Sequence, residues 1–232
     1  MGNGKKIVTA AIYLIVVAAF VAIACGTNIA TTTVAQLIPL ERNHTIIIDA
    51  GHGGVDGGAT SCNGILESHL NLEISLKLED LFHLLGYQTK MIRQTDISVY
   101  TSGESIAAKK VSDLRNRVKI VNGTDNAVLI SIHQNTFPDS KYNGAQVFYS
   151  AKGKELASNI QNALVAFVQK ENYRKPKPAD GIYLMKHIDC IGVLIECGFL
   201  SNPKEESLLR NASYQKKICS VITVSAAQFL TK

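Results

Sequence analysis

The chain has 232 residues, a formal net charge of +5, 46% hydrophobic residues and no tryptophan. This mild, dispersed positive charge suits the anionic surface of a wall or membrane and is too weak to indicate a nucleic-acid-binding protein. The cysteines, at positions 25, 62, 190, 197 and 219, form no CxxC pair and no Cys/His cluster, which argues against a thiolate zinc site. A disulfide is permitted outside the cytoplasm, but the sequence nominates no pair.

The first 26 residues combine a basic flank with an apolar run. Residues 7–25 follow two lysines, carry no charge and are long enough to span a bilayer as a retained anchor. Residues 22–24 (Ala-Ile-Ala) also fit the small-x-small cleavage site of a signal peptide. A third possibility is that Cys25 is a lipid-attachment residue. All three interpretations place the rest of the chain outside the cytoplasm, with the N-terminal lysines inside.

The remainder divides into a linker and one domain. Residues 27–43 are small, threonine-rich and unpatterned, as a linker would be, and residues 44–232 are enough for one domain with a substantial core. In chain order the patterns predict a strand at 45–51, a helix at 67–85, a strand at 87–93, a surface loop at 96–109, a helix at 112–122, strands at 128–133 and 145–150, a helix at 154–171, a basic loop at 174–178, a strand at 192–197, a helix starting at 201–205 and a helix at 214–229.

The alternation of aliphatic strands with amphipathic helices predicts the fold class. Strands that read as continuous apolar runs are buried on both faces. The expected architecture is therefore α/β, with a mainly parallel or mixed central sheet flanked by helices on both faces.

A carboxylate lies on the buried face of the first predicted helix. Apolar residues at positions 70, 74, 78, 81 and 85 form one helical stripe, and Glu67 shares that stripe at its first turn. Burying a carboxylate costs several kcal/mol unless a cation or a set of donors meets it. The helix N-terminus supplies only about 0.3–1 kcal/mol, so Glu67 indicates a metal.

Three further polar residues follow buried strands. His52 comes directly after the first strand, His133 ends the strand at 128–133, and Glu196 lies near the end of the last strand. The carboxyl ends of strands in α/β sheets border the functional crevice. Two imidazoles and one carboxylate form an open zinc site with a position left for water. We therefore predict one Zn²⁺ per chain on His52, Glu67 and His133, with Glu196 as the catalytic carboxylate.

Each of these residues has an ordinary alternative when taken alone. A histidine in a glycine-rich turn, a hydrogen-bonded histidine at a strand end and a glutamate in the first turn of a helix are all common. Glu196 is harder to explain, because a buried aliphatic strand has no structural need for it. The metal site explains all four residues with one hypothesis, whereas the alternative requires four coincidences.

Four segments carry a resemblance to a known family. They are IIIDAGHGGVDGGA, LESHLNLEISLKLEDLF, LISIHQNTF and GVLIECGFLSNPKEESLL. In combination, and over residues 45–231, they resemble the zinc-dependent N-acetylmuramoyl-L-alanine amidases of the third amidase family. The resemblance implies that His52, Glu67 and His133 bind zinc and that Glu196 is catalytic. The departures from the family pattern, at Ala50, Thr136 and Cys197, fall on none of these four residues.

The resemblance extends to the spore-cortex amidases of spore-forming bacteria. It implies that the protein removes stem peptides from muramic acid on the way to muramic δ-lactam, in sporulation and germination. The expected partners are peptidoglycan, a membrane through the N-terminal segment if it is uncleaved, and a possible protein activator, with no nucleic acid. Two rivals are a zinc carboxypeptidase or other peptidase acting on wall peptides, and a peptidoglycan-binding protein with a silent site.

Further residues have possible supporting roles in such a mechanism. Asn135, just past the second histidine, is placed to hydrogen-bond substrate. Asp49 could orient a ligand histidine. Arg117 and Arg93 could pair with substrate carboxylates, although solvated surface charge is an equally good explanation for both.

Overall fold

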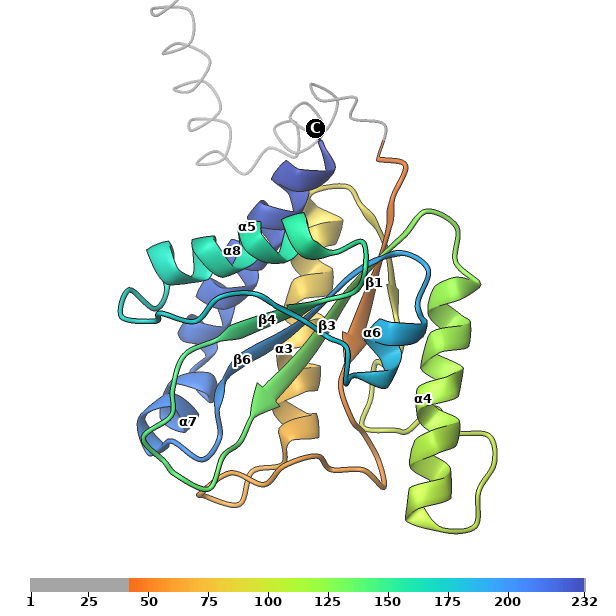
Figure 1. Ribbon diagram of the computed structural model, residues 1–232, viewed down its shortest axis with the longest axis horizontal. Coiled ribbons are helices and arrows are strands. Elements are labelled where there is room, and N and C mark those ends of the chain that lie inside the picture. Colours follow the sequence, from red (N-terminus) through yellow and green to blue (C-terminus); the bar gives the residue numbers. More distant parts are fainter. Residues whose placement is uncertain (1–41, 232) are drawn as a thin grey trace, which may run out of the picture. The chain divides into compact units, whose positions relative to one another are not determined.

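The structure is a computed structural model that describes residues 42–231. The predicted anchor or signal peptide at 1–26 and nearly all of the predicted linker at 27–43 lie outside the described residues. From Asn43 onward the chain forms one compact unit (Figure 1). In this described part, no helix combines the length and apolar character needed to cross a membrane.

A mixed sheet of six strands forms the centre of the domain. The strands are β1 (Thr45–Ala50), β2 (Gln88–Met91), β3 (Ala127–Asn135), β4 (Gln146–Tyr149), β5 (Lys177–Pro178) and β6 (Ile191–Phe199). Their order across the sheet is β2-β1-β3-β6-β4-β5. Strands β2, β1, β3 and β6 run parallel, and β4 is antiparallel to β6. The predicted α/β class with a mixed sheet is confirmed.

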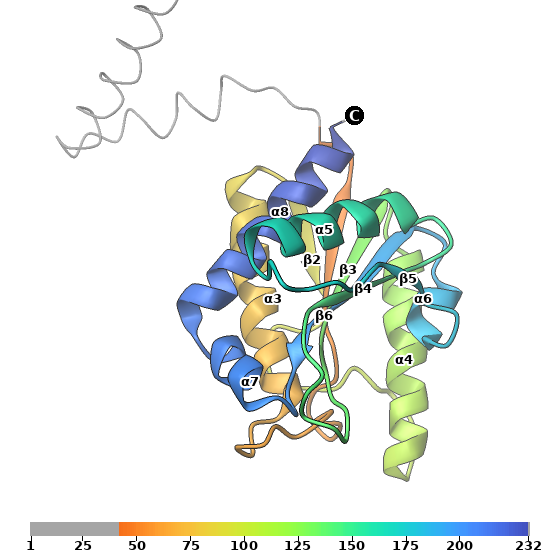
Figure 2. The ribbon, with the colours of Figure 1, turned by 60° about the vertical axis from the view of Figure 1, so that its left-hand side comes forward.

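Helices cover both faces of this sheet (Figure 2). One face packs against α3 (Glu67–Leu84), α5 (Lys154–Phe167) and α8 (Ala212–Leu230), and the other against α4 (Ile106–Asn122) and α6 (Tyr183–His187). The short helix α7 (Pro203–Leu209) follows β6 and is capped by Asn202, whose side chain accepts two backbone N–H groups. The predicted helix start at 201–205 is thus confirmed.

Alternation along the strands divides the core into two clusters. Successive side chains of a strand point to opposite faces of a sheet. Ile46 and Ile48 therefore pack with α3, α5 and α8, whereas Ile47 packs on the α4 side. In β6, Leu194 belongs to the α4 side and Cys197 to the opposite one. Cys197 thus faces away from Glu196, as the alternation predicts.

Some predicted boundaries are wrong. Helix α4 begins at Ile106 rather than at 112, because Ser105 caps it by accepting the N–H of Ala108. Ser112 instead lies inside the helix, where its hydroxyl accepts the N–H groups of Thr101 and Ser102 and holds the preceding loop. Helix α5 ends at 167 rather than 171, and the predicted basic loop contributes the two residues of β5. The four described cysteines are free thiols.

Candidate active site

His52 occupies a strained position directly after β1. Its φ of 60° lies in the left-handed region, which non-glycine residues rarely adopt. The backbone is held there because Arg117 donates a hydrogen bond of 2.7 Å from Nη2 to the carbonyl of His52. The imidazole Nδ1 lies 2.9 Å from Asp56 Oδ2, which leaves Nε2 facing Glu67 Oε2 at 3.2 Å. One ring nitrogen is thus fixed by the protein and the other is turned into the site.

Glu67 is the first residue of α3, and its carboxylate is buried. Oε2 accepts the N–H of Ala59, and Oε1 accepts the N–H of Gln134 and a side-chain N–H of Asn71. The same two oxygens contact the two histidines. Burial raises the pKa of Glu67, but hydrogen bonds from His133 and His52 outweigh this effect and hold the pKa well below its ordinary value. The carboxylate is therefore ionised and held in a fixed orientation.

His133 lies near the carboxyl end of β3, just before an irregularity in the pairing of β3 with β6. Its Nδ1 is 3.0 Å from Glu67 Oε1. The ring packs directly on Gly51, where an added Cβ would come within 2.2 Å of His133 Nε2. The absence of a side chain at position 51 is therefore what allows His133 to reach the site.

The three side chains form a potential metal site. One ligand atom from each of His52, Glu67 and His133 lies within 4.8 Å of the others. Tetrahedral ligands about 2.0–2.2 Å from one zinc ion lie roughly 3.3–3.6 Å apart, which is within this limit. Glu67 also contacts each histidine with a different oxygen, His52 through Oε2 at 3.2 Å and His133 through Oε1 at 3.0 Å. Burial lowers the pKa of His52, but Glu67 and Asp56 raise it overall. The site attracts positive charge, and the donor set fits a divalent metal.

Glu196 lies beside this cluster on β6, directly across from His133 in the strand register. Its Oε2 is buried and has no hydrogen-bond partner among the described residues. Burial raises the pKa of Glu196 to about 7. The nearby histidines His133 and His52 lower this pKa, and the negative charge of Glu67 raises it further. A carboxyl group with such a pKa can both accept and release a proton near neutral pH.

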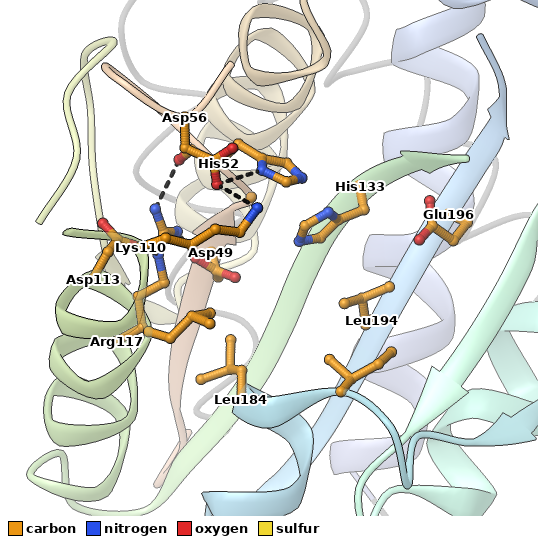
Figure 3. A pocket seen from close by; sticks show the side chains of 13 residues that line it. Asp49, His52, Asp56, Lys110, Asp113, Arg117, His133, Leu184, Leu194 and Glu196 are labelled. Carbon is orange, nitrogen blue, oxygen red and sulfur yellow. Dashed lines mark hydrogen bonds and ion pairs between the residues drawn. The ribbon is translucent and has the colours of Figure 1, made fainter. Parts of the chain in front are cut away.

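A pocket of about 210 Å³ connects these residues. It is lined by His52, His133 and Glu196, by polar side chains of α4 and by apolar side chains of α6 and β6. Figure 3 shows α4 on one side of the pocket and Glu196 on the other, with β3 between them. His52, His133 and Glu196 thus share one cavity at the carboxyl ends of β1, β3 and β6, as expected for an α/β sheet. The buried carboxylate of Glu67 does not line this cavity, but it contacts both histidines.

Two further predicted residues, Arg117 and Asp49, form a buried ion pair at the base of the pocket. Arg117 also bonds Asp113 and the carbonyls of Ala50 and His52, and Asp49 accepts a 2.6 Å hydrogen bond from Ser131. The guanidinium donors are therefore directed at protein acceptors. Asp49 contacts neither histidine by a hydrogen bond and reaches His52 only through Arg117.

Arg93 and Asn135 occupy different surroundings. Arg93 is only 2% exposed, and its side chain donates to the carbonyls of Ala50, Gly51, Ser68 and Thr95. It therefore fixes the backbone around the first histidine rather than facing the pocket. Asn135 is half-buried at the end of β3, two residues past His133.

The sequence patterns missed Asp56 and Lys110. Asp56 bonds His52, and Lys110 from α4 lies 3.0 Å from the same carboxylate oxygen of Asp56. The only sequence signal for Asp56 was an acid four residues after a histidine in a glycine-rich turn. Lys110 gave no sequence signal, because it falls between the predicted loop at 96–109 and the predicted helix at 112–122.

Replacement of Asp56 by alanine is expected to weaken metal binding at the candidate site about 10- to 100-fold, the usual effect of removing a carboxylate that orients a metal-ligating histidine. The loss of the Nδ1 partner frees the ring of His52 to rotate and to change tautomer. Competition with a chromogenic chelator measures the affinity. Asp139→Ala is the matched control, since Asp139 pairs with Lys141 on the exposed surface. Equal affinity in both variants would show that Asp56 does not orient the ligand.

Comparison with known proteins identifies the family. The sequence model of the N-acetylmuramoyl-L-alanine amidase family matches residues 46–227 of this chain. The chain belongs to this family. The amidase is 38% identical over 191 residues to the germination-specific N-acetylmuramoyl-L-alanine amidase of Bacillus subtilis, covering 81% of this chain and 80% of that protein. The predicted family is thus confirmed, and the protein is a peptidoglycan amidase.

Solved structures agree with this assignment. The amidase superposes on the CwlD amidase from Clostridioides difficile, solved in complex with the GerS lipoprotein, with a TM-score of 0.78 and 42% identity over 81% of this chain and 98% of that one. An N-acetylmuramoyl-L-alanine amidase from Clostridium difficile 630 gives a TM-score of 0.70 at 29% identity, over 82% of this chain and 98% of that one. The fold described above is therefore that of the amidase catalytic domain.

Proposed function

We propose that this amidase hydrolyses the amide between N-acetylmuramic acid and L-alanine with one zinc ion held by His52, Glu67 and His133. The observation that carries the proposal is the cluster of three ligand atoms within 4.8 Å, beside a buried carboxylate whose Oε2 has no partner among the described residues. A buried carboxylate oxygen left without a partner beside a pocket has a place for water or substrate. Such a site suits hydrolysis rather than structural support.

The protein side of the mechanism follows from this geometry. When bound, zinc supplies a Lewis acid that polarises the substrate carbonyl and makes the attacking water more acidic. Glu196 accepts the proton of that water as the oxygen attacks the carbonyl carbon. Glu196 then passes the proton to the amide nitrogen as the C–N bond breaks, so that muramic acid keeps the carboxyl group and the stem peptide leaves with a free amine.

The surrounding residues hold the reacting groups in position. In this proposal Arg117 and Asp49 maintain the strained loop that presents His52, in place of the predicted contact between Arg117 and a substrate carboxylate. Asp56 fixes the ring of His52, and Gly51 gives the ring of His133 room. Asn135 remains our candidate for a hydrogen bond to substrate, because it is half-buried two residues from a proposed ligand.

The biological setting is inferred from the relatives. The similarity to a germination-specific amidase supports a role in the spore cortex, where removal of the stem peptide precedes formation of muramic δ-lactam. The structure of a related amidase with the GerS lipoprotein supports a protein partner for this chain as well. We place the enzyme outside the cytoplasm, secreted or anchored through residues 1–26.

The product formed from peptidoglycan tests the proposal. Residues 27–232 would be incubated with zinc and purified peptidoglycan, and the products identified by mass spectrometry. We expect stem peptides with a free L-alanine amine, formed only when zinc is present. Release of D-alanine would instead identify a carboxypeptidase, and the absence of any new product would favour a binding protein with a silent site.

A further inference from the structure

Strand β4 lies next to Glu196, on the side of β6 that faces away from β3. Gln146 of β4 lies directly opposite Glu196 in the antiparallel pairing of β4 with β6. Residues paired in this way project from the same face of the sheet, with Cβ atoms about 4.5–5.5 Å apart. Gln146 is therefore the immediate neighbour of Glu196 on the side away from α4.

The side chain of Gln146 holds a basic segment, which we define as residues 173–178 (Tyr-Arg-Lys-Pro-Lys-Pro). Its Oε1 accepts a 3.2 Å hydrogen bond from Arg174, and its amide nitrogen donates to the carbonyl of Lys175. Arg174 also donates a 2.8 Å bond to the carbonyl of Asn143. The basic segment is thus attached to the strand residue that adjoins Glu196, and it runs along β4 through the pairing of β5 (Figure 2).

The basic segment presents free positive charge. Lys175 and Lys177 are exposed, and no carboxylate within residues 42–231 forms an ion pair with either of them. Lys177 pairs with Phe148, which alternates with Gln146 and so lies on the same sheet face as Glu196. Pro176 and Pro178 restrict the backbone, so that little conformational entropy is lost when a ligand binds.

We propose that the basic segment is the subsite that takes the carboxylates of the stem peptide, the leaving group of the reaction. This inference rests on the proposed function, in which Glu196 gives its proton to the departing amine. The leaving peptide then lies on the Glu196 side of the pocket, where Gln146 is paired with Glu196 and holds the segment that carries Lys175 and Lys177. A stem peptide ends in a carboxylate, and the two lysines complement that charge.

A pair of muropeptides that differ only in charge tests the subsite. One carries a short stem peptide with free carboxylates, and the other carries the same peptide with each carboxylate converted to a carboxamide. In the Lys175→Gln/Lys177→Gln double variant we expect KM for the first to rise about tenfold with kcat nearly unchanged, because two exposed ion pairs are lost. KM for the carboxamide form should stay as in the wild type, and added salt should reduce the difference.

Lys216→Gln/Lys217→Gln on α8 is the matched control, because it removes the same charge from exposed positions on a helix that covers the opposite face of the sheet. Equal changes with both muropeptides, or no change with either, would overturn the subsite. If the wild-type enzyme with zinc cleaves neither muropeptide, the proposed function fails instead. Calorimetric binding of the free acidic peptide then decides the subsite: tenfold weaker binding to the Lys175/Lys177 variant supports it, and equal binding overturns it.

Discussion

Replacement of Glu196 by glutamine is expected to lower kcat by roughly 10²–10⁴-fold, the usual contribution of a general acid–base group. Glutamine has nearly the same shape but cannot accept a proton from water or return one to the amine. The bound zinc should remain at one ion per chain, because Glu196 is not among the three clustered ligands. Turnover of a muropeptide, measured together with elemental analysis, separates the two effects.

Stability provides a second readout for this variant. The Oε2 atom of Glu196 is buried without a partner in the described part of the chain, and burial raises the pKa of the carboxyl group to about 7. A neutral amide removes the cost of burying the charge, so thermal unfolding should occur at the same or a higher temperature. Glu171→Gln, at an exposed position, is the control. Near-normal kcat in Glu196→Gln would remove this residue from the mechanism.

Replacement of His133 by alanine is expected to abolish zinc binding and, with it, activity. The three ligand atoms lie within 4.8 Å of one another, and the loss of one leaves only His52 and Glu67. Two ligands from the protein do not make a stable zinc site, since such sites use three or more. The zinc content of the purified variant should fall from one per chain to near zero in elemental analysis.

Thermal unfolding tests the same variant independently of activity. A ligand that binds only the folded state raises its stability, so zinc should raise the Tm of the wild type but leave that of His133→Ala unchanged. His83→Ala is the control, because His83 is exposed on α3 and contacts Thr89 away from the pocket. Unchanged zinc stoichiometry in His133→Ala would refute the proposed metal site.

The sequence was sufficient to predict the residues that the structure brings together, three of them in the pocket and Glu67 against the two histidines. Aliphatic strands and the helical stripe are local patterns. Polar residues that interrupt these patterns, at strand ends or on a buried face, can be recognised without knowing any distant contact. His52, His133 and Glu196 were selected at strand ends, and Glu67 on the stripe. In an α/β sheet the carboxyl ends of parallel strands meet at one edge, so these positions converge.

Other features depended on tertiary structure, because they join segments that are far apart in the chain. The ion pair of Asp56 with Lys110 requires α4 to lie beside the loop after β1. The burial of Arg93 and Arg117 against backbone carbonyls could not be distinguished in sequence from solvated surface charge. The start of α4 at 106 rather than 112 is a local exception, since Ser105 rather than Ser112 caps the helix.

The candidate metal site and the proposed leaving-group side of the pocket therefore differ in origin. The residues of the candidate site could be predicted from the sequence, because they interrupt local patterns of apolar residues. The neighbours of Glu196 were set by the antiparallel register of β4, which places Gln146 and the basic segment beside it. A one-residue shift in that register would turn Gln146 to the other face of the sheet, and only the folded structure determines the register.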